Sequence, residues 1–262
     1  MNEAADFLGG AHGVLGSHLA LGVFILFCRI GGCLMLAPGF SNAQIPTQVR
    51  LFIALAATLA LTPLLIGRLP LQKLSDEPLP ALRMIGTELL IGGSIGLMAR
   101  IFMIALETMA VASATGLGLA NPFGVEMEAN DALPPLATFV TLSATALIFV
   151  LDLHWEVLRG LVASYSAVPV SDTFDPGFAL RHIGDILVET FRAALRICSP
   201  FILYAIVVNL AISIINRLTP QIAIFYISAP FVIAGGLALL FFTIKSMLGE
   251  FMASFSAWLV SG

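Results

Sequence analysis

The stretch IAIFYISAPFVIAGGLALLFFTI, residues 222–244, contains no charged side chain. A helix of about 20 residues crosses the apolar core of a bilayer, because each residue adds about 1.5 Å to a core about 30 Å thick. The stretch is therefore long enough and apolar enough to span a membrane. Its apolar residues are continuous and do not alternate with polar ones, which favours a helix over a strand of a membrane barrel.

Five further apolar segments precede this one, and the composition agrees with them. The chain of 262 residues is 59% hydrophobic and 11% charged, whereas an ordinary soluble domain has roughly 25% charged residues. Its apolar surface must therefore meet lipid or other proteins. We expect the earlier segments at about Val14–Ala37, Leu51–Ile66, Met84–Thr115, Leu136–Leu151 and, after a charged start near His182, Ile197–Ile215.

The fold that these segments predict is an all-α, membrane-type protein of about six long apolar helices in hairpins. Polar stretches are expected from Arg68 to Arg83 and from Asp152 to about Arg181, and residues 246–260 are expected to form a short amphipathic tail. No linker rich in Pro, Gly or Ser divides the chain. We therefore expect one unit, residues 1–262.

The distribution of Lys and Arg predicts the orientation, since these residues are enriched in cytoplasmic loops. With six spans, the side that holds both termini also holds most of the basic residues of the loops, and we expect this side to be the cytoplasm. The cytoplasmic set is Arg68, Lys73, Arg83, Arg159, Arg181 and Lys245, against Arg50 and Arg217 on the other side.

Several charged residues lie inside the apolar segments. Arg29 falls in the first segment, and Glu88, Arg100 and Glu107 fall in the third. A charge at the middle of a bilayer costs at least about 2.5 kcal/mol. These residues therefore suit helices that are buried against other helices or subunits, and we expect them to make polar contacts there.

A second group of charges forms one stripe at the start of the fifth segment. Asp185, Glu189, Arg192 and Arg196 follow Arg181 at helical spacing. Glu189 and Arg192 can pair across one turn for about 0.2–0.5 kcal/mol. Two interpretations remain open, a solvated face and a polar stripe that contacts another subunit or faces a pore.

No pattern in the sequence predicts catalysis. There is no metal-binding helix of the His-Glu-x-x-His type, no phosphate-binding loop and no nucleophile elbow. The three cysteines lack the spacing of a metal site or a disulfide framework and are expected to be buried thiols. The small net charge of −4 gives no case for nucleic acid. We expect no enzyme, no cofactor and no metal.

The stretch after the third segment is unusual for a loop because it is apolar. Glycine supplies backbone freedom there and Asn-Pro supplies turn chemistry. One interpretation is an ordinary helix end, and the other is a segment that lines or plugs a pore. The stretch consists of Gly116, Leu117, Gly118, Leu119, Ala120, Asn121, Pro122 and Phe123.

The chain resembles the FliR/SctT family of type III secretion export-gate proteins, and the resemblance extends over nearly its whole length. Four stretches carry it: FCRIGG (27–32) with APGF (37–40), IP (45–46) and VR (49–50); residues 86–100 followed by GLGLANPF (116–123); LDLH (151–154) with SY (164–165) and VP (168–169); and NL (209–210) with RLTPQI (217–222) and FYISAP (225–230). The GLGLANPF stretch resembles the flagellar branch more than the virulence branch.

The resemblance implies a pore-forming subunit that assembles with FliP and FliQ homologues at the flagellar basal body in the inner membrane. Unfolded flagellar proteins would pass through this pore, with FlhB around its entrance and FlhA in the neighbouring machinery. Residues 1–180 would pack like FliP and residues 181–262 like the FliQ hairpin, with a tail. Residues 116–123 would be the plug that closes the resting pore.

Two other functions remain open beside the virulence counterpart. A small-solute transporter would show inverted repeats and a polar site at the middle of the membrane, and the sequence shows no convincing repeat. A membrane-embedded scaffold or assembly factor would be absent from the finished pore.

Overall fold

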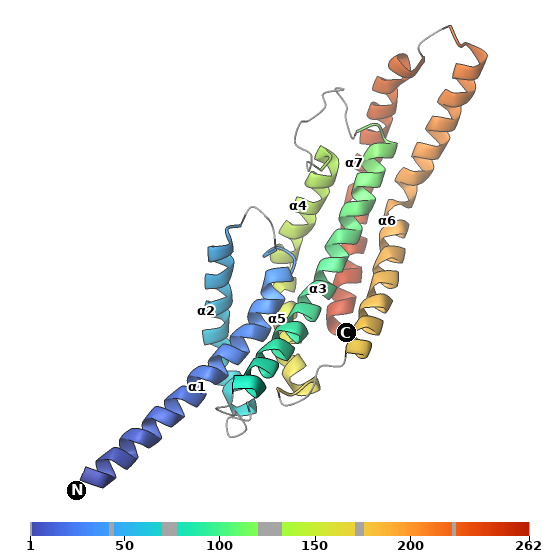
Figure 1. Cartoon of the computed structure of the whole chain (residues 1–262). Helices are drawn as coiled ribbons and strands as arrows, with labels where there is room; N and C mark the ends of the chain where they lie inside the picture. Colours follow the sequence, from blue (N-terminus) through green and yellow to red (C-terminus); the bar gives the residue numbers. More distant parts are fainter. Residues whose placement is uncertain are drawn as a thin grey trace. The chain divides into compact units, whose positions relative to one another are not determined.

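The computed structural model describes residues 2–41, 45–69, 78–119, 133–170, 176–221 and 224–261, and within these ranges it contains helices and no strand. The all-α prediction is confirmed. The helices, shown in Figure 1, are α1 (Asn2–Leu36), α2 (Thr47–Leu65), the short 3-10 helix η1 (Ile66–Arg68), α3 (Pro78–Gly116), α4 (Pro135–Val150), α5 (Leu153–Ala167), α6 (Pro176–Leu218) and α7 (Ile224–Ser261).

Five of these helices, α1, α2, α3, α6 and α7, are long and apolar enough to cross a membrane. The number is six if α4 and α5 together form one broken span. The break between them lies at Asp152, whose φ of 58° is left-handed. The prediction of about six long apolar segments is confirmed.

Two stretches that are expected to be polar or amphipathic are helical. The stretch from Asp152 to Arg181 contains α5, whose buried side chains Val157, Leu161 and Tyr165 recur every four residues on one face. The expected tail at 246–260 is the second half of α7, where Met247, Phe251 and Phe255 are buried with the same spacing. In both stretches, polar residues on the other face lower the mean hydropathy without ending the helix.

The chain folds as two compact units. The first consists of Met1–Arg100 with Trp155–Gly184, and the second of Ile101–His154 with Asp185–Gly262. The long helices α3 and α6 each pass from one unit to the other. The division near residue 180 into a FliP-like part and a FliQ-like hairpin stays a prediction.

In the first unit, α1 packs against α2 and crosses α3 at very short range. A Cβ atom on Gly92 would overlap the backbone carbonyl of Arg29, and one on Gly96 would overlap that of Cys33. The Gly-x-x-x-Gly spacing of α3 therefore lets two helix backbones approach each other within the chain.

In the second unit, α6 and α7 form the long hairpin seen in Figure 1, and α4 packs on α7. The hydroxyl of Tyr204 on α6 donates a hydrogen bond of 2.9 Å to the carbonyl of Val232 on α7. Pro200 lies inside α6 and cannot donate to the carbonyl of Arg196. The hydroxyl of Ser199 donates to that carbonyl instead, at 2.8 Å, so the helix continues through the proline.

Candidate functional site

One face of α3 carries both the close approach to α1 and a carboxylate. Glu88 and Gly92 lie four residues apart, so they are neighbours on this face. The overlap that a Cβ on Gly92 would make shows that the backbone at Arg29 lies directly against α3. The glycine therefore brings the Arg29 side chain of α1 within reach of Glu88, one turn away.

Arg29 and Glu88 form a buried ion pair with two parallel hydrogen bonds. Nε of Arg29 donates to one carboxylate oxygen at 2.6 Å, and Nη2 donates to the other at 2.8 Å. The two side chains are 0% and 1% exposed. Bidentate pairing of this kind fixes the orientation of both groups, and the charge on each group raises the strength of both bonds.

The rest of the Arg29 guanidinium is held by the C-terminal end of α5. Nη1 donates to the hydroxyl of Ser164 at 3.2 Å, and Nη2 donates to the carbonyl of Val168 at 3.0 Å. That carbonyl lies just past the end of the helix, where the helix dipole favours a cation. The guanidinium carbon also lies 4.1 Å from the centre of the Tyr165 ring, a cation–π contact.

This cluster joins three helices of the first unit through one side chain. The sequence singles out Arg29 and Glu88 as polar contacts between helices, but it does not reveal that they pair with each other. It also missed the roles of Ser164, Tyr165 and Val168, although these residues lie in one of the stretches that carry the family resemblance. All the contacting groups are acceptors or a ring face, so the arrangement holds a cation in place.

The other two charges of the third segment lie apart from this cluster. Arg100 and Glu107 are both half-buried on α3. In the described part of the chain neither forms an ion pair, since the pairs there are Arg29–Glu88 and the exposed Arg159–Glu156. Their proposed contacts with other helices or subunits stay a prediction.

The first half of the candidate plug forms the C-terminal end of α3. Gly118 has a φ of +71°, the amide of Leu119 donates to the carbonyl of Ala114 at 2.8 Å, and the amide of Gly118 donates to Thr115 at 3.1 Å. This is the Schellman arrangement, in which a left-handed glycine ends a helix. Gly118 is therefore required by the turn, whatever the following residues do.

The side chains of this helix end pack against other helices of the second unit, to which it belongs. Leu117 is fully buried and lies against Gly236 of α7, where a Cβ atom would meet its side chain at 3.1 Å. At Gly116, an added Cβ would lie 2.7 Å from that of Ala205 on α6. Residues 116–119 are thus anchored to α6 and α7, whereas Ala120, Asn121, Pro122 and Phe123 lie outside the described residues.

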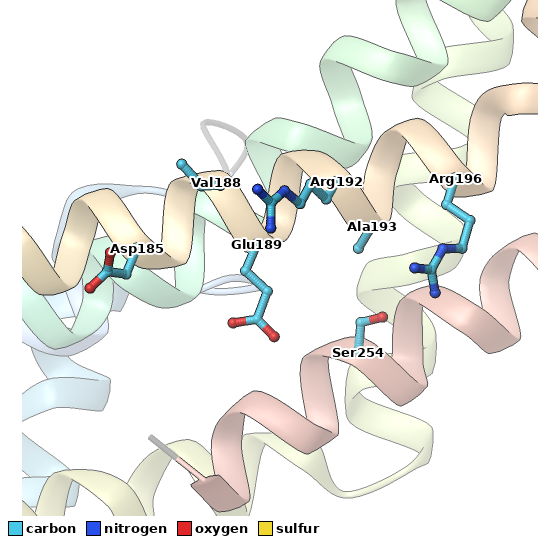
Figure 2. A pocket seen from close by; sticks show the side chains of 7 residues that line it. All are labelled: Asp185, Val188, Glu189, Arg192, Ala193, Arg196 and Ser254. Carbon is cyan, nitrogen blue, oxygen red and sulfur yellow. The ribbon is translucent and has the colours of Figure 1, made fainter.

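The charged stripe of α6 borders an open groove in the second unit. Asp185, Glu189, Arg192 and Arg196 are all exposed and line a space of about 550 Å³ together with Ser254 of α7. Figure 2 shows the carboxylate of Glu189 and the guanidinium of Arg196 directed toward α7. The expected pair between Glu189 and Arg192 is absent from the ion pairs of the described chain.

The described residues include no group of three or more His, Cys, Asp or Glu side chains that could hold a metal ion. Cys28, Cys33 and Cys198 are buried and free, as the sequence predicts. The candidate sites in the described part of the chain are therefore an internal ion pair, a helix end and a surface stripe.

A sequence model of the bacterial export proteins, family 1, matches residues 20–258. The chain belongs to this family. It is 29% identical over 223 residues to the flagellar biosynthetic protein FliR of Caulobacter vibrioides, which covers 82% of this chain and 85% of the relative. The FliR protein of Aquifex aeolicus is 26% identical over 231 residues, which is 87% of this chain and 86% of the relative. That of Escherichia coli is 25% identical over 218 residues, which is 81% of this chain and 80% of the relative.

Proposed function

We propose that this chain is the FliR-type subunit of a flagellar type III export gate. In this role it assembles with FliP and FliQ homologues into a pore, with FlhB and FlhA homologues beside it, and unfolded flagellar proteins cross the inner membrane through that pore. The observation that carries the proposal is the family match over residues 20–258, together with relatives named for flagellar biosynthesis.

The distribution of apolar surface supports a role inside an assembly. Half of the residues in the most apolar windows of α1 and α3 are buried by the chain itself, but only 17% of those in α6 and 6% of those in α7. Phe241 and Phe242 on α7 are each 78% exposed. The α6–α7 hairpin therefore has a wide apolar surface that must meet lipid or neighbouring subunits.

The plug belongs to the same proposal. A closed pore needs apolar side chains that exclude water and ions, and residues 116–123 supply them. Gly116 to Leu119 belong to the C-terminal end of α3, so the test leaves them in place. A deletion of residues 120–123 keeps the described helix end and removes the rest of the proposed plug. We expect cells that express this variant to leak small ions, and unchanged conductance with normal assembly would contradict the plug.

Co-purification from the membranes of the native host tests the proposed function directly. A tagged chain is expected to bring down FliP and FliQ homologues in fixed ratios, and a deletion strain is expected to stop exporting flagellar proteins until the wild-type gene is restored. A chain absent from the isolated pore complex would indicate an assembly factor. Solute uptake by the purified chain alone in liposomes would indicate a transporter, and partners from a virulence system would indicate that branch.

We also propose that both termini face the cytoplasm, as the Lys and Arg counts favour. An impermeant label that reaches cysteines placed at the termini from the periplasmic side would contradict this orientation.

A further inference from the structure

The guanidinium of Arg29 holds α3 and α5 by contacts of unequal strength. Glu88 of α3 is a charged acceptor and takes two of the hydrogen bonds, at 2.6 and 2.8 Å. The acceptors on α5 and just past its end are neutral, the hydroxyl of Ser164 at 3.2 Å and the carbonyl of Val168 at 3.0 Å. In a buried site the attraction between opposite charges adds to the hydrogen bonds of the first contact and is absent from the second. The contact with α5 is therefore the one that opens more easily.

The outer side of the same helix end is held by an exposed hydrogen bond. Nη1 of Arg68, in η1, donates to the hydroxyl of Ser166 at 2.7 Å. Water can replace an exposed bond of this kind at little cost. Residues 164–168 are thus attached to the rest of the first unit by one buried and one exposed arginine.

The docked position of α5 leaves one buried polar group unsatisfied. Tyr165 is only 4% exposed, and its hydroxyl has no hydrogen-bond partner among the described residues. A buried hydroxyl without a partner destabilises the state in which it is buried. When α5 moves away, water can hydrogen-bond to this hydroxyl, so undocking removes that cost.

The helix is also short and bounded by a break at each end. α5 has 15 residues, whereas α1 and α3 have 35 and 39. It begins directly after the left-handed Asp152 and ends at Ala167, as Figure 1 allows the reader to follow. α5 can therefore separate from α1 and α3 without unwinding either of them.

We propose that residues 164–168, the C-terminal end of α5 with its last contact, form a latch with a docked and a released state. The docked state is the one described above. In the released state Arg29 keeps its ion pair with Glu88 and loses its contacts with α5, and the hydroxyl of Tyr165 and the carbonyl of Val168 become accessible. This inference does not depend on the proposed function, because it concerns contacts within the first unit.

Hydrogen–deuterium exchange of the purified full-length chain in detergent, read by mass spectrometry, tests the latch. Sub-global opening makes the amides of one element exchange faster than those of its neighbours. We expect the amides of α5 to exchange at least about tenfold faster than those of α1 and α3 around Arg29 and Glu88. A common opening rate for the three helices would overturn the proposal, since it would show that the cluster opens only as a whole.

Two substitutions act on the docked state in opposite directions. Tyr165→Phe removes the unsatisfied hydroxyl and is expected to slow the exchange of α5 about fivefold or more. Ser164→Ala removes an acceptor of the buried guanidinium and is expected to speed it about tenfold. Tyr204→Phe is the matched control, because that hydroxyl is bonded within the second unit, and it is expected to leave α5 unchanged.

The variants also define the results that contradict the latch. Exchange of α5 that is unchanged or faster in Tyr165→Phe would show that the docked state bears no cost at this hydroxyl. Unchanged exchange in Ser164→Ala would show that Arg29 does not hold the helix end. If Ser164→Ala is not recovered from membranes, the wild-type chain and Tyr165→Phe still decide, since neither loses a hydrogen bond of the docked state.

Discussion

Neutralising Glu88 tests whether the buried ion pair stabilises the first unit. In the variant Glu88→Gln the side chain keeps its shape and one acceptor, but the guanidinium of Arg29 loses its counter-charge. Arg29 is 0% exposed and donates four hydrogen bonds, so water does not replace the carboxylate. Removing one member of a buried pair costs about 3–5 kcal/mol. Because Gln keeps an acceptor, we expect the low end, about 3 kcal/mol, which lowers the ratio of folded to unfolded chain roughly a hundredfold.

The exposed pair of the same unit provides the matched control. Arg159 is 75% exposed in its pair with Glu156. We expect Glu156→Gln to lower the free energy of unfolding by no more than about 0.5 kcal/mol, because solvent screens this pair. Both variants are measured by denaturant titration of the purified chain in the same detergent, alongside their abundance in membranes.

A double variant separates the cost of an unpaired charge from the value of the pair. Arg29→Met with Glu88→Leu removes both charges and fills the space with apolar atoms, which in other buried pairs is often neutral or stabilising. We expect it to be more stable than Glu88→Gln. Equal losses of stability in Glu88→Gln and Glu156→Gln would refute the reasoning. So would a double variant whose loss equals the sum of the losses of Arg29→Met and Glu88→Leu made separately.

Three further changes test the packing of the helices through the free energy of unfolding. Gly92→Ala forces α1 away from α3 and is expected to lower the free energy of unfolding by about 1–3 kcal/mol. Gly86→Ala on the same helix meets no atom within 4 Å and is expected to raise it by about 0.5–1 kcal/mol. Similar values for the two variants would be inconsistent with the close approach of α1 and α3. Gly118→Ala is expected to cost about 1–2 kcal/mol and Gly118→Asn less, because φ is +71° there, and equal stability of all three chains would argue against the helix end described above. Tyr204→Phe loses a hydrogen bond and is expected to cost about 0.5–1.5 kcal/mol. Tyr165→Phe removes a buried hydroxyl that has no partner among the described residues and is expected to cause no loss. A larger loss for Tyr165→Phe than for Tyr204→Phe would show that the hydrogen-bond assignment is wrong.

The helix class was predictable from the sequence because continuous apolar stretches have few physical alternatives. The boundaries were less predictable where one face of a helix is polar. Over its whole length, Leu153–Ala167, α5 has a lower mean hydropathy than the other α-helices, and the four-residue recurrence of its buried positions reveals the helix. Mean hydropathy discards that periodicity, which is why the stretch was expected to be polar without a helix being assigned to it.

Single candidate residues were easier to find than their partners. A charge inside an apolar segment is conspicuous, so the sequence singles out Arg29 and Glu88. Their pairing depends on the crossing point of α1 and α3, which Gly92 permits, and it joins two residues that are 59 positions apart in the sequence. Val168 contributes through its backbone carbonyl, which no side-chain pattern can indicate.

The two groups of charges in this chain differ in what neutralises them, and this difference separates internal structure from assembly. Arg29 is satisfied by α3 and α5 of its own unit, so an isolated chain can form this cluster as it folds. The exposed charges of the stripe on α6 belong to no ion pair among the described residues, and they precede the apolar part of that helix. The apolar part of α6 that follows the stripe is largely exposed, with 17% of its window buried, and must meet lipid or another subunit. Stability of the α6–α7 hairpin is therefore expected to rise on assembly, while the Arg29 cluster stabilises the chain before its partners bind.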